Sequence, residues 1–251
     1  MKTEWNYSDL AEAYKSRPDY SDDAVKAMLS IAATKPGDKV CDIGAGVGHL
    51  TLMLERHNLD VTAIEPNEAM RSIGAKRTMS NRIHWYDGTG ESTGQLSQSF
   101  NLATFGSSFN VCNRPRALVE SARILKSGGW FACMWNHRDL ADEVQIEIEL
   151  IIRKYLPGYE YGSRREDQSA IIESSGLFMN SVHINSRIVH EQAIAEVVRA
   201  WHSHATLQRQ AGKHFLNILK EIDKLLSNLA SPTIQVPYTT NIWIAQLKAN
   251  R

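Results

Sequence analysis

The sequence has no excess of charge of either sign and no long hydrophobic run. Lysine and arginine together number 28, as do aspartate and glutamate, so the formal net charge is zero. A neutral chain lacks the strong basic field of many nucleic-acid-binding proteins, so we expect no nucleic-acid partner. No apolar run approaches a membrane span, and the opening MKTEWNYSDL lacks the apolar core of a signal peptide. We therefore expect no membrane attachment and a cytoplasmic protein.

Potential cross-links and metal ligands are also scarce. Cys41, Cys112 and Cys133 are the three cysteines, and their spacing forms no pair. His202 and His204 lie two positions apart, and residues at that spacing do not share a face of a helix. We therefore expect neither a disulfide framework nor a metal site, and a reducing intracellular setting.

Strand-like apolar runs alternate with helix-like patterns between residues 39 and 135. The strand-like runs are 40–43, 61–64, 83–86, 102–105 and 130–135, and the helix-like patterns are 49–56, 68–76 and 116–125. Alternation of this kind is typical of α/β proteins in which right-handed crossovers connect parallel strands. The first half of the chain therefore predicts a doubly covered parallel sheet.

The second half has a different pattern. A helix is predicted over 143–155 and a strand over 182–189, and NIWIAQL closes the chain as a second strand. Between these strands lie two helix-like patterns, one with an apolar face over Phe215–Leu229. We interpret this insertion as a lid over the carboxyl end of the sheet. The expected segments are N-terminal helices that form part of the lid (1–38), a ligand-binding core (39–189), the helical lid insertion (190–238) and the final strand of the core (239–251).

A glycine-rich turn follows the first strand in the motif DIGAGVG (Asp42–Gly48). Its spacing is G-x-G-x-G, and His49 stands where a dinucleotide fingerprint has its third glycine. The carboxylate of Asp42 would repel a pyrophosphate and attract a ligand that carries an ammonium and a sulfonium. An acid, Glu65, ends the next strand about twenty residues on, where a carboxylate binds ribose hydroxyls. A dehydrogenase is therefore a weaker alternative.

Three motifs together resemble the class I S-adenosylmethionine-dependent methyltransferases. DIGAGVG resembles their first motif, Glu65 resembles the acid that holds both ribose hydroxyls, and ILKSGGWF (Ile124–Phe131) resembles their LKPGG stretch. The resemblance implies S-adenosyl-L-methionine as cofactor. It also implies a Rossmann-like α/β fold with a mostly parallel seven-stranded sheet, helices on both faces and a helical lid inserted before the last strand.

Further motifs are similar to one branch, the small-molecule methyltransferases related to trans-aconitate methyltransferase. They are YKSRPDY (Tyr14–Tyr20), GTGE (Gly88–Glu91), WN (135–136) and VPYTTNIWIAQ (236–246). This branch implies O- or N-methylation of a metabolite by a monomer or homodimer. The resemblance assigns a cofactor role to Tyr14, Arg17, Asp42, Gly44, Gly46, Gly48, Glu65, Pro66, Met70, Gly88, Thr89, Gly90, Glu91, Gly106 and Ser107.

The acceptor is expected between two loops at the carboxyl ends of central strands, FGSSFN (Phe105–Asn110) and WNHRD (Trp135–Asp139). We expect Asn110, His137 and Arg138 to face it. His137 is the first candidate for a general base, whereas a carboxylate acceptor needs no base and would be held by Arg138. The sequence leaves both open, with His202, His204 and Arg209 of the lid as further candidates.

Two other functions remain open. A protein with this cofactor and fold can catalyse a different reaction, such as a cyclisation, or act as a non-catalytic partner subunit. The stretch after the fourth strand reads GSSF and lacks the Asn/Asp-Pro-Pro-aromatic motif of enzymes that methylate nucleic-acid amines. We therefore expect a small-molecule acceptor.

Overall fold

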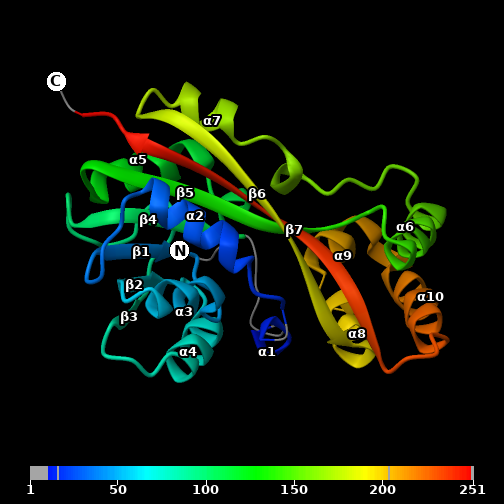
Figure 1. Ribbon diagram of the computed structural model, residues 1–251. Helices are drawn as coiled ribbons and strands as arrows, with labels where there is room; N and C mark the ends of the chain where they lie inside the picture. The colour runs from blue at the N-terminus through cyan, green and yellow to red at the C-terminus, as the bar shows by residue number, and fades with distance from the viewer. Residues whose placement is uncertain (1–10, 16, 203, 250–251) are drawn as a thin grey trace.

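The protein is described by a computed structural model that covers residues 11–15, 17–202 and 204–249. Its centre is a seven-stranded sheet in the order β3-β2-β1-β4-β5-β7-β6 (Figure 1). Strands β1 to β5 pair in parallel, and β7 pairs antiparallel with both β5 and β6. The strands are β1 Lys39–Ile43, β2 Asp60–Ile64, β3 Ile83–Tyr86, β4 Phe100–Gly106, β5 Leu125–Arg138, β6 Phe178–Ala193 and β7 Thr233–Leu247. The predicted Rossmann-like, mostly parallel sheet is confirmed.

Helices begin where short polar side chains cap them. Ser21, Asn67 and Asn113 each accept a hydrogen bond from a backbone N–H in the first turn of α2, α4 and α5. The helices are α1 Ala11–Tyr14, α2 Asp22–Ile31, α3 His49–Arg56, α4 Glu68–Arg77, α5 Arg114–Ile124, α6 Glu143–Tyr155, α7 Ser169–Ser174, α8 Ile194–His202, α9 Ala205–Ala211 and α10 Phe215–Ser227. In the described part of the chain, no helix is both long and apolar enough to cross a membrane.

The sheet buries apolar side chains on both faces because successive residues of a strand point to opposite sides. On β5, Phe131 and Cys133 join the cluster under α5 and α7, whereas Ala132 and Met134 join the cluster under α2 and α3. On β7, Trp243 and Ile244 divide in the same way. Helices therefore cover both faces of the sheet, as predicted.

A separate helical unit has its own core beside the sheet (Figure 1). Its buried side chains come from α6, α8, α9 and α10 and from the near ends of β6 and β7. The sequence analysis placed α6 in the core segment, but Ile148 and Ile152 pack in this helical cluster. Strands β6 and β7 also extend past the expected boundaries, to Ala193 and from Thr233, because they pair with each other over their whole length. The insertion between β6 and β7 is thus connected to the sheet by a long antiparallel pair of strands.

Candidate active site

The glycine-rich turn connects β1 to α3 at the carboxyl edge of the sheet. The backbone N–H groups of Gly44 and Ala45 both donate to the carbonyl of Ile64, at 2.8 and 3.0 Å. Gly44 has a φ of 67°, and a side chain there would meet Cβ of Ser108 at 2.5 Å. Glycine is therefore required at this position for both its backbone angle and its close contact. The turn is held against β2 on one side and against the loop after β4 on the other.

Glu65 joins the glycine turn to the beginning of α4. Its Oε2 accepts a hydrogen bond from the N–H of Gly46 at 2.9 Å, and its Oε1 accepts one from the N–H of Asn67 at 2.8 Å. The residue is 6% exposed, and burial raises its pKa despite these two bonds. A carboxylate has about four lone-pair sites, so two further donors can bind. The vicinal hydroxyls of a ribose fit this requirement, which agrees with the role expected for Glu65.

Asp42 lies beneath the glycine turn, in the interior of the protein. It is fully buried and accepts hydrogen bonds from Oγ1 of Thr51 at 2.6 Å and Oγ1 of Thr104 at 3.1 Å. Burial raises its pKa to about 6. Asp42 points away from the face that takes Cys41 and Ile43, as strand alternation dictates. The expectation that this carboxylate directly attracts a ligand cation is therefore corrected. Asp42 instead supports the turn through its hydrogen bonds to Thr51 of α3 and Thr104 of β4.

The loop after β4 is fastened to three neighbours. Ser107 has a φ of 60°, its N–H donates to the carbonyl of Met134 at 2.8 Å, and its Oγ shares a hydrogen bond with the Tyr20 hydroxyl at 2.8 Å. Ser108 donates from Oγ to the carbonyl of Ile43 at 2.6 Å. A non-glycine residue in the left-handed region persists only where its surroundings hold it, and such residues concentrate at functional sites. Tyr20 was not among the predicted site residues, although it closes the quoted YKSRPDY motif.

His49, in place of a third glycine, ties the N-terminal segment to the glycine turn. Its Nδ1 lies 2.8 Å from Oδ1 of Asp19, and its Nε2 lies 2.8 Å from the carbonyl oxygen of Tyr14. Both partners are acceptors, so the ring makes both bonds when both nitrogens carry protons. The bond from His49 lowers the pKa of Asp19. Arg17 lies over the Tyr14 ring at 3.6 Å, which brings these two predicted cofactor residues to the same edge.

The GTGE stretch forms a tight turn beside β2 and α5. A side chain at Gly88 would meet the Ile64 side chain at 2.8 Å, and one at Gly90 would meet Sγ of Cys112 at 2.5 Å. Thr89 and Ser92 form an isolated antiparallel β-bridge. The Glu91 carboxylate accepts a hydrogen bond from the N–H of Asn113 at 2.5 Å. Met70 is buried against Val47 of the glycine turn. The predicted cofactor residues thus gather around the carboxyl ends of β1, β2 and β4.

The predicted catalytic residues are more constrained than the sequence indicated. Oδ1 of Asn110 accepts a hydrogen bond from Nε1 of Trp135 at 2.9 Å. Nδ1 of His137 lies 3.2 Å from the Asn241 amide nitrogen, and its Nε2 lies 2.9 Å from the carbonyl oxygen of Arg164. Burial and the nearby Arg165 lower the pKa of His137 to about 4. A general base needs a free acceptor nitrogen, and both nitrogens of this ring are engaged with Asn241 and Arg164, so the expected role of His137 as a general base stays a prediction.

Arg138 lies at the boundary between the sheet and the helical unit. Its guanidinium is 4.5 Å from the centre of the Trp201 ring, and His204 stacks on that ring from α9 with centroids 5.1 Å apart. His202 faces the other way and pairs with Asp223 at 3.0 Å. Charge alone predicts a solvated loop for GSRRED (162–167), but its two arginines are partly buried, and they contact Arg138 and His204.

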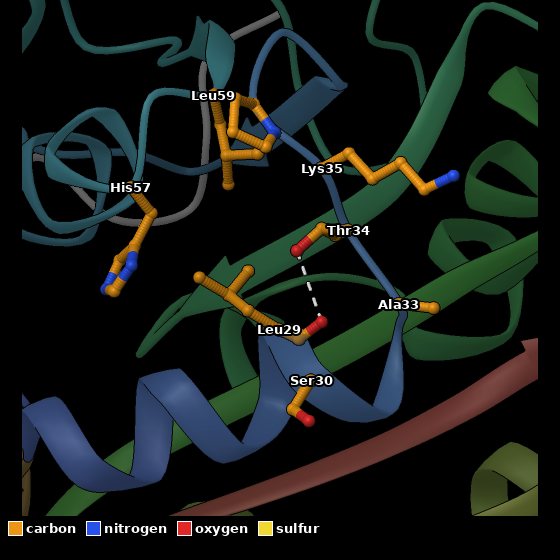
Figure 2. Close-up of a pocket in the computed structure, with 8 residues that line it drawn as sticks. Leu29, Ser30, Ala33, Thr34, Lys35, His57 and Leu59 are labelled. Carbon is orange, nitrogen blue, oxygen red and sulfur yellow. Dashed lines mark hydrogen bonds between the residues drawn. The ribbon is translucent and has the colours of Figure 1, made fainter.

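Two further features of the described residues bear on the site. In that part of the chain, no group of three or more His, Cys, Asp or Glu side chains could hold a metal ion. A surface pocket lies at the opposite edge of the sheet, before β1 and β2 (Figure 2). It is lined by Leu29, Ser30, Ala33, Thr34, Lys35, Pro36, His57 and Leu59. The pocket contains none of the predicted site residues, so it does not contribute to the candidate active site.

Comparisons with known proteins agree with this geometry. Residues 41–133 match the family described as a methyltransferase domain. An uncharacterized methyltransferase of Mycobacterium tuberculosis is 30% identical over 135 residues, which cover 53% of this chain and 53% of the relative. The ubiquinone/menaquinone biosynthesis C-methyltransferase of Zymomonas mobilis is 27% identical over 139 residues, which cover 50% of this chain and 57% of the relative. The chain spans about half the length of the curated relatives it matches.

The fold as a whole is similar to solved structures. The crystal structure of the YcgJ protein from Bacillus subtilis superposes with a TM-score of 0.57 at 17% sequence identity. The superposition covers 92% of this chain and 100% of that chain. At this identity the likeness concerns the fold alone. The finer resemblance to the trans-aconitate branch stays a prediction.

Proposed function

We propose that the protein methylates a small molecule. The basis is its domain of the class I S-adenosylmethionine-dependent methyltransferase family, whose cofactor is S-adenosyl-L-methionine. The observation that carries the proposal is Glu65, a buried carboxylate fixed by the N–H groups of Gly46 and Asn67 with room for two more donors. A small-molecule acceptor is supported by the helical unit, which approaches the carboxyl edge of the sheet through the contact between Trp201 and Arg138.

The bound cofactor supplies a methyl group on a sulfonium, which is already activated for transfer. The chain then has to hold the acceptor in line with that group and exclude water. We assign the cofactor wall to the glycine turn, to Glu65 and to the strained Ser107, whose loop leaves the central strand β4. His137 acts as a positioning residue, because its hydrogen bond fixes the main chain of Arg164.

Turnover with isotopically labelled cofactor tests the proposal. We expect the purified chain to bind S-adenosylhomocysteine and to pass labelled methyl groups to a component of a small-metabolite mixture, and the Glu65→Ala variant to lose most of this transfer. Mass spectrometry of the product discriminates the alternatives, because a cyclase leaves the mass of its substrate unchanged. Cofactor binding without any labelled product would contradict the methyltransferase assignment and favour a partner subunit.

A further inference from the structure

Three arginines converge where the sheet meets the helical unit. Arg138 ends β5, and Arg164 and Arg165 belong to the 3-10 turn η3 (Ser163–Arg165). Nη2 of Arg165 donates to the carbonyl of Arg138 at 3.0 Å, and Arg164 reaches His204 at 3.3 Å. The pKa of Arg164 is lowered to about 10, chiefly by burial, and the positive charges of Arg138, Arg165 and Arg17 contribute to the same shift. We call Arg138, Arg164 and Arg165 the arginine cluster.

The carboxylates next to the arginine cluster in sequence have partners elsewhere. Asp139 pairs with Arg187 at 3.6 Å, and Glu166 pairs with Arg114 at 3.4 Å. The nearest acid from α6, Glu149, pairs with Arg153 at 3.6 Å and also accepts a hydrogen bond from the Tyr161 hydroxyl. The charge of Glu149 also acts on Arg165 and Arg138, so one shared carboxylate faces three guanidinium groups, and the positive charge of the arginine cluster exceeds the negative charge beside it within the described residues.

Hydrogen-bond donors without acceptors concentrate at the same place. Of the eight buried side-chain polar atoms without a partner among the described residues, five are donors in or beside the arginine cluster. They are Nε of Arg138, Nε of Arg164, Nε of Arg165, the hydroxyl of Tyr159 and Nε1 of Trp201. Tyr159 is 3% exposed and Trp201 is 2% exposed, so water does not reach these groups freely. Buried donors are normally paired, so a group of unpaired ones indicates a site for an acceptor-rich ligand.

The contact between Arg164 and His204 adds a further donor. Nδ1 of His204 accepts the N–H of Leu207 at 3.2 Å, as the cap of α9. Burial and the arginines lower the pKa of His204 well below the usual value, so its ring is neutral and has a single acceptor nitrogen. The ring therefore cannot accept from both Leu207 and Arg164, whose Nη2 lies 3.3 Å from Nε2, and one of these two donors is left without a ring acceptor. An oxygen atom of a ligand can accept from the donor that the ring leaves over.

We propose that the arginine cluster, with Tyr159 and His204, binds an oxyanion of the methyl acceptor, a carboxylate or a phosphate. This proposal rests on the proposed methyltransferase function, because the bound oxyanion is taken to be part of the methyl acceptor. Guanidinium groups bind such anions through paired, charge-assisted hydrogen bonds, and the surplus of donors matches the surplus of acceptor sites on an oxyanion. The site lies at the carboxyl end of β5, the same edge of the sheet that holds the glycine turn, so the anion anchors the acceptor beside the cofactor.

Calorimetry with matched probes tests this assignment. The full chain is titrated with succinate, with inorganic phosphate and with the neutral analogue succinamide, at constant ionic strength, with and without S-adenosylhomocysteine. We expect at least one anion to bind saturably and succinamide not to bind. Arg164→Gln removes a charged donor and should weaken anion binding at least about tenfold. Tyr159→Phe removes only a hydroxyl and should weaken it about two- to tenfold without loss of folding.

Arg199→Gln, at an exposed arginine of α8, is the matched control and should bind as the unmodified chain does. The assignment fails if neither anion binds better than succinamide, or if Arg164→Gln and Tyr159→Phe bind anions as tightly as the unmodified chain. Equal loss of S-adenosylhomocysteine affinity in these variants would assign the arginines to the cofactor carboxylate instead and would also overturn it. Failure of the unmodified chain to bind S-adenosylhomocysteine would contradict the proposed function. This outcome is independent of the anion site, because anion binding is also measured in the absence of S-adenosylhomocysteine.

Discussion

At the scale of single residues, two buried carboxylates have different surroundings. Asp42 accepts hydrogen bonds from two threonine side chains in the interior, whereas Glu65 accepts from two backbone N–H groups at the edge of the sheet. Burial raises the pKa of both. Only Glu65 adjoins the open side of the glycine turn. Substitution of Glu65 should therefore change ligand affinity, whereas substitution of Asp42 should change the pH dependence of stability.

Replacement of Glu65 by alanine should weaken binding of S-adenosylhomocysteine at least about tenfold. The change removes an acceptor for two ribose hydroxyls, and charge-assisted hydrogen bonds contribute about 1.5–3 kcal/mol each. It also removes the link between Gly46 and Asn67. Calorimetry measures the affinity, and Glu68→Ala, at an exposed acid that begins α4, is the control. Unchanged affinity in Glu65→Ala would exclude contact between this carboxylate and the ribose.

Asp42 should make stability depend on pH. Because burial raises its pKa to about 6, from about 3.9 in unfolded chains, the folded protein keeps this proton between those values while the unfolded chain loses it. The contribution of this group to stability is therefore largest below about pH 4 and falls, by about 3 kcal/mol, as the pH rises through about 6. In urea denaturation, the stability of Asp42→Asn relative to the unmodified chain should rise by that amount between pH 4 and 7. Parallel curves for the two proteins would show that Asp42 is not buried as a titrating carboxyl.

At the scale of elements, the N-terminal segment connects two parts of the site. His49 binds Asp19 and the carbonyl of Tyr14, and the hydroxyl of Tyr20 binds Ser107. Helix α1 also contacts both α4 and α8, so it lies between the cofactor edge and the helical unit (Figure 1). A segment held by side chains from α3 and from the loop after β4 should become more ordered when a ligand stabilises these two parts.

Hydrogen exchange should report this coupling. We expect the amides of Arg17, Asp19 and Tyr20 to exchange more slowly when S-adenosylhomocysteine is bound, because the ligand stabilises the glycine turn that precedes His49. In His49→Ala the additional protection should be reduced, while the protection of β1 is retained. Exchange that is the same with and without ligand would remove the closing role of Tyr14 and Arg17.

At the scale of the whole molecule, β6 and β7 join the sheet to the helical unit. Ile242 and Ile244 of β7 pack in the core of the sheet, whereas Val236 and Tyr238 of the same strand pack in the helical cluster. Both parts therefore share one backbone ladder from Phe178 and Leu247 to Ala193 and Thr233, with a register shift between Met179 and Val182. Loss of one part should destabilise the other.

A buried leucine of α10 tests this coupling. Leu226→Ala should lower the free energy of unfolding by about 2–5 kcal/mol, because the side chain is fully buried in the helical cluster. Leu216→Ala, on the same helix but 74% exposed, should change it by less than about 0.5 kcal/mol. Scanning calorimetry should show one transition that shifts as a whole in Leu226→Ala. A separate early transition for the helical unit would show that the two parts unfold independently.

The sequence by itself determined the elements and the cofactor edge. The alternating apolar periods predicted the strands β1 to β5, and the helices over 49–56 and 143–155 were placed at their observed limits. The glycine turn and Glu65 were found because they lie at the ends of consecutive strands, where the spacing along the chain fixes their spacing in the fold. Such signals are local, since periodicity and turn chemistry need only neighbouring residues.

Only the tertiary structure decided the acceptor side. His137 reads as a free base in the sequence, but its ring is bound by Asn241, which β7 brings back from 104 positions away. By their charge Arg164 and Arg165 indicate a solvated loop, but Tyr161, His204 and the main chain of Arg138 contact them, and buried donors without acceptors lie beside them. Burial and donor balance depend on contacts between distant segments, and a charged side chain acquires its chemistry only when those contacts remove it from water.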